Sequence, residues 1–112
     1  MINWIPLINE AQSVDIKELS NSRAQVIFKH STRCTLSSVA KKRLEREIQP
    51  GFIDFYFLDL IKFRSLSDKV AADFAVYHES PQVILIKNNS CVYEESHGGI
   101  LMEDILDQVQ LN

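Results

Sequence analysis

The residue of this chain best placed to do chemistry is Cys34, which stands between a strand-forming and a helix-forming segment. Residues 24–29 are mostly apolar and β-branched or aromatic, residues 30–33 form a polar break, and helical periodicity begins at Cys34 or Thr35. A helix start exposes unpaired backbone N–H groups and carries partial positive charge, and both favour a thiolate over a thiol. Because the thiolate is the nucleophile, this position predicts a reactive cysteine.

Two neighbours of Cys34 bear on how it would react. Arg33 precedes it and adds positive charge, and Ser37 stands three residues later, where a dithiol oxidoreductase carries its second cysteine. A serine can donate a hydrogen bond to a thiolate, but it cannot displace a disulfide. We therefore expect a one-cysteine mechanism, in which Cys34 becomes a mixed disulfide and an external thiol regenerates it.

A second candidate site element is Pro81, which opens an apolar strand and follows Ser80. If the bond before Pro81 is cis, the backbone of Ser80 would lie beside the cysteine and could pair with an extended substrate. His97, before two glycines, is either a residue that reaches the substrate side or a structural histidine. His30 is expected to be a solvated loop residue.

The second cysteine, Cys91, lies on the strand after a hairpin turn and is expected to be a packed or half-exposed thiol. A resolving role would require its sulfur to lie close to that of Cys34. Two distant cysteines do not make a zinc site, and we expect no tightly bound cofactor.

The elements that must position these residues follow from the hydrophobic pattern. It predicts strands over 24–29, 52–60, 82–87 and 90–95, and helices over 14–21, 34–48, 64–74 and from about 100 to 109. Residues 2–7 form either a short edge strand or an irregular lead-in. Ser13 is expected to cap the first helix, Pro50-Gly51 to stop the second, and Asn88-Asn89 to form a two-residue hairpin turn.

The order of these elements indicates a fold. A helical crossover joins the first two strands, so they should be parallel, and the hairpin makes the last two antiparallel. This arrangement is thioredoxin-like: an α/β domain with a four-stranded mixed sheet core flanked by helices on both faces. We expect a single domain over residues 1–112, because no linker or repeat interrupts the chain.

Composition restricts the function classes. The chain has 112 residues, of which 46% are hydrophobic and 24% charged, with a formal net charge of -3. This charge gives no general electrostatic reason to expect nucleic acid or an anionic membrane as a partner. No apolar run is long enough to span a bilayer, and the first ten residues lack a secretory pattern, so we expect a cytoplasmic protein.

Several short motifs together resemble a known family. Residues 28–34, Phe-Lys-His-Ser-Thr-Arg-Cys, followed by Ser37-Ser38, resemble the signature of the YtxJ-type monothiol bacilliredoxins. Residues 79–82, Glu-Ser-Pro-Gln, and Ser96-His97 are similar to further landmarks, and the resemblance covers nearly the whole chain.

The resemblance implies a thioredoxin-fold enzyme that removes bacillithiol from S-bacillithiolated proteins. It implies that Cys34 is the nucleophile and that the segment Ser80-Pro81 faces the substrate. The chain departs from the family at Thr35, where a proline is usual. Thr35 supplies an additional N–H and a hydroxyl at the helix start, and so joins Arg33 as a candidate for stabilising the thiolate.

The leading hypothesis is therefore a monothiol thiol-disulfide oxidoreductase acting on S-thiolated proteins, with a low-molecular-weight thiol as co-substrate. Bacillithiol as that thiol comes from the resemblance, and no residue excludes glutathione or coenzyme A. An alternative is a carrier that holds an iron–sulfur cluster between two subunits, as monothiol glutaredoxins do. A further alternative is a redox-inactive thioredoxin-like binding module. The sequence does not give the oligomeric state.

Overall fold

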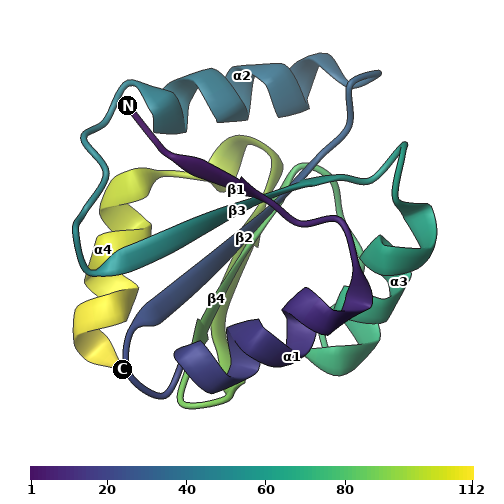
Figure 1. Cartoon of the computed structure of the whole chain (residues 1–112). Helices are drawn as coiled ribbons and strands as arrows, with labels where there is room; N and C mark the ends of the chain where they lie inside the picture. The colour runs from purple at the N-terminus through teal and green to yellow at the C-terminus, as the bar shows by residue number, and fades with distance from the viewer.

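The computed structural model describes all residues from 1 to 112. Helices and strands alternate from β1 to β4; β5 then follows β4 directly, and a 3-10 turn precedes the last of the four α-helices (Figure 1). In chain order the elements are β1 (Trp4–Pro6), α1 (Glu10–Leu19), β2 (Ala24–His30), α2 (Thr35–Glu45), β3 (Ile53–Asp59), α3 (Arg64–Asp73), β4 (Gln82–Lys87), β5 (Ser90–Ser96), η1 (His97–Gly99) and α4 (Met102–Leu111). None of these helices is both long and apolar enough to cross a bilayer.

The strands form a single mixed sheet in the order β1-β3-β2-β4-β5, with β2 in the centre. Strands β1, β2 and β3 are parallel, whereas β4 runs antiparallel to β2 and β5 antiparallel to β4. The thioredoxin-like α/β prediction holds, but the prediction of four strands is wrong by one. Trp4–Pro6 pairs with β3 as a short edge strand, where Pro6 is tolerated because one side of an edge strand needs no donor.

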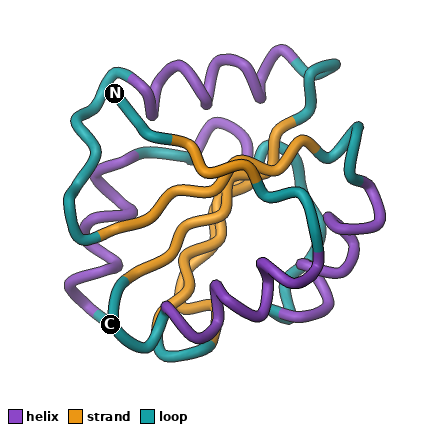
Figure 2. The backbone as a smooth tube through the Cα atoms, viewed as in Figure 1, coloured by secondary structure: helices purple, strands orange, loops and turns teal.

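Helices cover both faces of this sheet, as the backbone tube in Figure 2 shows. One core lies between the sheet and the helices α2 and α4, and the other lies between the sheet and α1 and α3. Successive residues of β2 point alternately to the two cores, so Val26 and Phe28 belong to the first and Ile27 to the second. All seven residues of β2 are buried, as expected for a central strand covered on both faces.

The start of α1 differs from the prediction. The helix begins four residues earlier than expected, because Asn9 and not Ser13 is its cap: the Asn9 side chain accepts from the backbone N–H of Gln12 at 3.1 Å. Gln12 in turn accepts from the Asn9 N–H, which completes a capping box. Ser13 lies inside the helix, buried, and its hydroxyl donates to Asp73 of α3.

The hairpin turn is formed as predicted. Asn88 and Asn89 both have positive φ, at 52° and 73°, which asparagine tolerates better than most residues. Past β5 the chain forms the turn η1, in which His97, and neither glycine, has a positive φ, of 55°.

Candidate functional site

Cys34 occupies the N-cap position of α2 with extended backbone, at φ -114° and ψ 118°. Its N–H donates to the carbonyl of Ser31 at 3.1 Å, and its own carbonyl accepts from the N–H groups of Ser37 and Ser38 at 3.1 and 3.3 Å. The thiol is free and partly exposed, and the first turn of α2 carries no acidic residue. The sulfur therefore lies at a helix N-terminus whose partial positive charge no side chain caps.

Ser37 is held by partners other than the sulfur of Cys34. Its Oγ accepts from the N–H of Ser31 at 3.0 Å and lies 2.7 Å from Nδ1 of His30. Ser37 is fully buried, so this contact links the end of β2, the loop after it and the first turn of α2. The Ser37 hydroxyl thus fixes the backbone that presents Cys34, and its direct action on the thiolate stays a prediction.

The expectation that His30 is a solvated loop residue is wrong. His30 is the last residue of β2 and is buried, with its ring 5.2 Å from that of Phe57 and 5.9 Å from that of Phe28. Burial lowers the pKa of His30, and the nearby charge of Lys41 lowers it further, so the ring is neutral at pH 7. The strand continues one residue beyond the prediction because this ring packs against the α2 side of the sheet.

The segment before β4 approaches the same end of the sheet. The Ser80–Pro81 peptide bond is cis, and the carbonyl of Pro81 accepts from the N–H of His97 at 3.0 Å. The register aligns Lys29 with Gln82, and Gln82 with the last residue of β5. The end of β2 that leads to Cys34 therefore lies beside the start of β4 and the end of β5.

The last predicted site residue, His97, stands on the rim of this end of the sheet. Its Nε2 lies 3.5 Å from Oε2 of Glu79, with both side chains about half exposed. Arg43 of α2 donates to the carbonyls of Gly98 and Ile100, at 3.2 and 3.4 Å, and so ties η1 to the helix that begins at Cys34.

Arg33 and Thr35 flank Cys34 and are exposed. The fold thus brings the loops with Cys34, Ser80-Pro81 and His97 to one end of the sheet. Which of these residues contacts a substrate stays a prediction.

Sequence reasoning missed a second buried polar group, Lys29, which was treated only as the end of a strand. Its Nζ donates to the carbonyl of Ser67 at 3.0 Å and lies 3.2 Å from Nδ1 of His78. The sequence does carry one signal, since a lysine inside an apolar run on a central strand must be either misplaced or partnered. Its partners come from α3 and the loop before β4, which sequence alone does not bring together.

Cys91 lies at the other end of the sheet. It pairs with Ile86, which pairs with Gln25 near the start of β2, and His30 lies five residues further along β2 than Gln25. At about 3.3 Å per residue this spans roughly 17 Å, whereas a disulfide needs Cα atoms within about 7 Å. In this fold Cys91 therefore cannot resolve a disulfide formed at Cys34.

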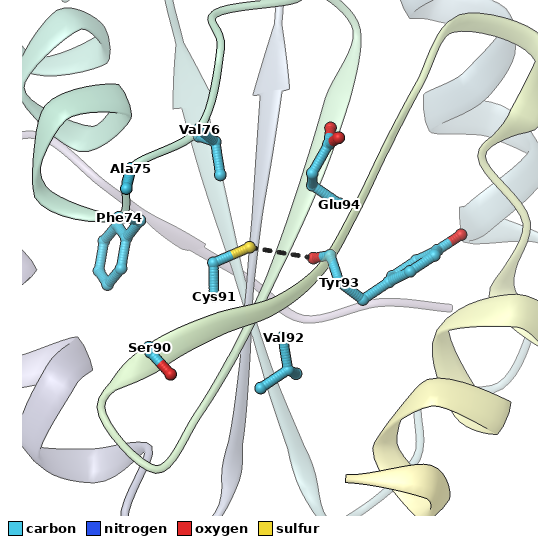
Figure 3. A pocket seen from close by; sticks show the side chains of 8 residues that line it. All are labelled: Phe74, Ala75, Val76, Ser90, Cys91, Val92, Tyr93 and Glu94. Carbon is cyan, nitrogen blue, oxygen red and sulfur yellow. Dashed lines mark hydrogen bonds between the residues drawn. The ribbon is translucent and has the colours of Figure 1, made fainter.

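An open pocket of about 510 Å³ surrounds Cys91, between β5 and the segment after α3 (Figure 3). The Cys91 thiol donates to the carbonyl of Tyr93 at 3.4 Å, and Phe74 and Val76 face it across the pocket (Figure 3). Burial raises the pKa of the Cys91 thiol, so it is protonated at neutral pH. These surroundings match the expected packed, half-exposed thiol.

Comparison with solved structures supports the fold. The chain is 29% identical, with a TM-score of 0.80, to a structure described as an oxidoreductase candidate with a thioredoxin fold, over 95% of this chain and 92% of that one. It also superposes on thioredoxin from Trypanosoma brucei brucei, with 11% identity, a TM-score of 0.75, and 98% and 93% coverage. Thioredoxin from Fasciola hepatica gives 19% identity and a TM-score of 0.69, over 92% and 97% of the two chains.

A family model assigns the chain more narrowly. The model described as monothiol bacilliredoxin BrxC matches residues 5–105, which include Cys34, Ser80-Pro81 and His97. Together with the fold, this match indicates a thiol oxidoreductase, and the resemblance found in the sequence is confirmed. The chain belongs to the monothiol bacilliredoxin family.

Proposed function

We propose that this protein reduces mixed disulfides between proteins and a low-molecular-weight thiol, with Cys34 as the only catalytic cysteine. In the first step the Cys34 thiolate attacks the small-thiol sulfur of the mixed disulfide. A new disulfide forms between Cys34 and the small thiol, the original S–S bond breaks, and the protein substrate leaves as a thiolate that takes a proton from solvent.

A second, external thiol completes the cycle. Its thiolate attacks the small-thiol sulfur now joined to Cys34, and Cys34 leaves as the thiolate that began the reaction. The net reaction consumes one external thiol: the small thiol of the mixed disulfide and the external thiol leave joined as one disulfide, and the protein substrate leaves as a free thiol. We propose bacillithiol as the small thiol, in accordance with the family to which the chain belongs.

The observation that carries this proposal is the solitary position of Cys34 at the start of α2. The fourth position of the motif holds Ser37, whose hydroxyl is engaged with His30 and Ser31. The other cysteine, Cys91, lies at the far end of the sheet, so no thiol of this chain can compete with the external thiol for the mixed disulfide. A low-molecular-weight thiol is small enough to reach the partly exposed sulfur of Cys34.

The substrate side of the site is proposed to consist of Ser80-Pro81 and His97. Both lie on loops beside the end of β2 that leads to Cys34, and the Pro81–His97 hydrogen bond holds the two loops together. In this proposal the backbone of Ser80 pairs with the polypeptide on one side of the mixed disulfide, and Arg33 and Thr35 border the small thiol.

The test is reduction of a bacillithiolated model protein, with excess bacillithiol as the external thiol. Cys34→Ser should lose activity by at least about a thousandfold, because no other group supplies the nucleophile. Cys91→Ser should keep activity within about twofold of the unchanged protein, and it serves as the matched control for removing a thiol.

Two results would contradict the proposal. One is a Cys34 that alkylates no faster at neutral pH than a free cysteine in an unfolded peptide, which would leave a thioredoxin-like binding module. The other is stoichiometric iron and sulfide in purified protein, lost in Cys34→Ser, without mixed-disulfide reduction. That result would favour the cluster-carrier alternative.

A further inference from the structure

The most unusual residue of the core is Lys29, which has no exposed surface although it carries a charge. Lysine is rarely buried completely, because removing an ammonium group from water costs free energy unless partners replace the lost hydrogen bonds. Burial lowers the pKa of Lys29 from 10.5 to about 8, so the ammonium still predominates at neutral pH. The core thus retains a cation where an apolar side chain would pack at least as well.

The partners of this ammonium lead to the loop before Pro81. Its Nζ donates to the carbonyl of Ser67 in α3 at 3.0 Å and contacts Nδ1 of His78 at 3.2 Å. Burial lowers the pKa of His78, and the charge of Lys29 lowers it further, so the ring is neutral and Nδ1 can accept. Lys29 therefore ties the loop to both the central strand and α3.

A second buried side chain supports the neighbouring loop residue. Gln82 is fully buried and lies directly opposite Lys29 in the sheet register. Its Nε2 donates to the carbonyl of Tyr77 at 2.9 Å and to Oε2 of Glu94 at 3.1 Å. Lys29 and Gln82, which are neighbours in the sheet, thus contact two consecutive loop residues, His78 and Tyr77, on the inner side of the loop.

The outer side of this loop is open. The side chain of Tyr77 is 92% exposed, and Glu79 is about half exposed beside His97. The Ser80 Oγ is covered and has no hydrogen-bond partner within the chain. The loop is therefore held on its inner side, and its outer side is open to solvent at Tyr77 and Glu79.

We propose that Lys29 is a positioning residue, which fixes the loop 76–81 through His78 so that Ser80 meets the polypeptide flanking the mixed disulfide. The inference deepens the proposed function and rests on it, and it names an extended polypeptide as the part of the substrate that this loop recognises. Lys29 touches no reacting atom, and it faces α3 whereas Cys34 begins α2. Its loss should weaken the binding of protein substrates and leave the nucleophile unchanged.

The main test compares Lys29→Met with Lys42→Met, a matched control on the exposed side of α2. In Lys29→Met the KM for a bacillithiolated protein should rise about tenfold, the effect expected for losing a charge-assisted hydrogen bond. The KM for a small symmetric disulfide, the kcat and the alkylation rate of Cys34 should each change less than about twofold. The Tm should be equal or higher, because methionine fills the site without a buried charge.

A merely structural role for Lys29 would give the opposite pattern, with a lower Tm and an unchanged KM, and that result would overturn the proposal. An equal rise in KM for the protein and for the small disulfide would also overturn it. If wild-type protein does not reduce mixed disulfides at all, the proposed function fails. The contact between Lys29 and the loop is then tested by a measurement on the loop that does not depend on activity.

That independent measurement is amide exchange of residues 76–80, together with the NMR titration of the His78 ring. Lys29→Met should speed exchange in this loop and raise the pKa of His78, since the adjacent cation is gone. His78→Leu should produce the same rise in KM as Lys29→Met, and it is the second variant if the first does not fold. Unchanged exchange and an unchanged His78 titration in Lys29→Met would overturn the anchoring role.

Discussion

Lys29 and His30 are consecutive residues of β2, and they organise opposite faces of the sheet. His30 points toward α2, where it contacts the Ser37 hydroxyl at 2.7 Å beneath the loop that carries Cys34. Lys29 points toward α3, where it contacts the loop that leads to Pro81. The nucleophile and the proposed substrate loop are thus supported from one strand end, through two different kinds of polar group.

His30 and Lys29 differ in charge, and we expect this difference to separate their effects on the protein. The histidine is neutral and hydrogen-bonded among aromatic rings, so its support of Cys34 adds no charge to the core. The lysine keeps a cation where desolvation opposes it. We expect substitutions near His30 to change the reactivity of the Cys34 thiol, and substitution of Lys29 to change the binding of protein substrates. We also expect the two kinds of substitution to change the free energy of unfolding by very different amounts.

The largest expected effect concerns the pH dependence of stability. Below pH 8 both the folded and the unfolded states carry a charged Lys29, and its burial destabilises the folded state. Between pH 8 and 10.5 the folded state has lost this proton and the unfolded state still holds it, so stability rises with pH. Lys29→Met should therefore exceed wild type in unfolding free energy by up to about 3 kcal/mol below pH 8.

This advantage should shrink toward zero by about pH 10.5, which chemical denaturation at a series of pH values would measure. Taking the difference between the two proteins cancels the titration of groups common to both, including the tyrosines whose pKa is raised by burial. A difference that stays constant from pH 7 to 10.5 would show that Lys29 does not titrate in this range.

A smaller effect is expected on the other face. Ser37→Ala leaves Nδ1 of His30 and the N–H of Ser31 without their partner, and should lower the unfolding free energy by about 2 kcal/mol. The alkylation rate of Cys34 should change as well, because the backbone that presents it is released. Ser38→Ala is the matched control one residue along the helix, and equal losses in the two variants would contradict a special role for Ser37.

The smallest expected loss of stability is at the start of α1, far from both Lys29 and His30, and it serves as a control for the activity measurements. Asn9→Ala removes the side-chain cap of α1 and should cost about 1 kcal/mol. Enzyme activity at 25 °C should be unchanged, which would show that a modest loss of stability does not by itself impair the site. A fall in kcat of more than about threefold in Asn9→Ala would weaken every activity comparison between the two faces.

Much of the fold was predictable because local signals agreed with the tertiary structure. The apolar run of β2 and the paired asparagines of the hairpin each have one favourable conformation, which the structure adopts. Helix α2, however, ends at Glu45, three residues before the predicted end at 48, so Pro50-Gly51 does not directly stop it. The start of α1 was wrong because Ser13 and Asn9 are both good caps. Only the pairing of Asn9 with Gln12 decides between them, and that contact depends on the loop geometry.

The position of Cys34 at the start of α2 was predictable from the sequence, whereas the buried residues that support it were not. The helix start and Ser37 can be read from spacing, whereas the burial of His30 depends on Phe57 and α2 meeting above the sheet. The role of Lys29 depends on His78, 49 residues away in sequence. A polar residue in a buried strand signals that a partner exists, but the partner's identity comes only from the packing of other elements.

The two open edges of the sheet bear on how this protein behaves when concentrated. A free strand edge can template pairing with another chain, which leads to aggregation. Edge strand β1 has only three residues and ends in Pro6, which has no N–H to offer. At the other edge β5 carries Glu94 and Glu95, and a register shift between Leu85 and Ile86 interrupts its ladder with β4. Both edges therefore disfavour strand-to-strand pairing between copies of the chain at high concentration.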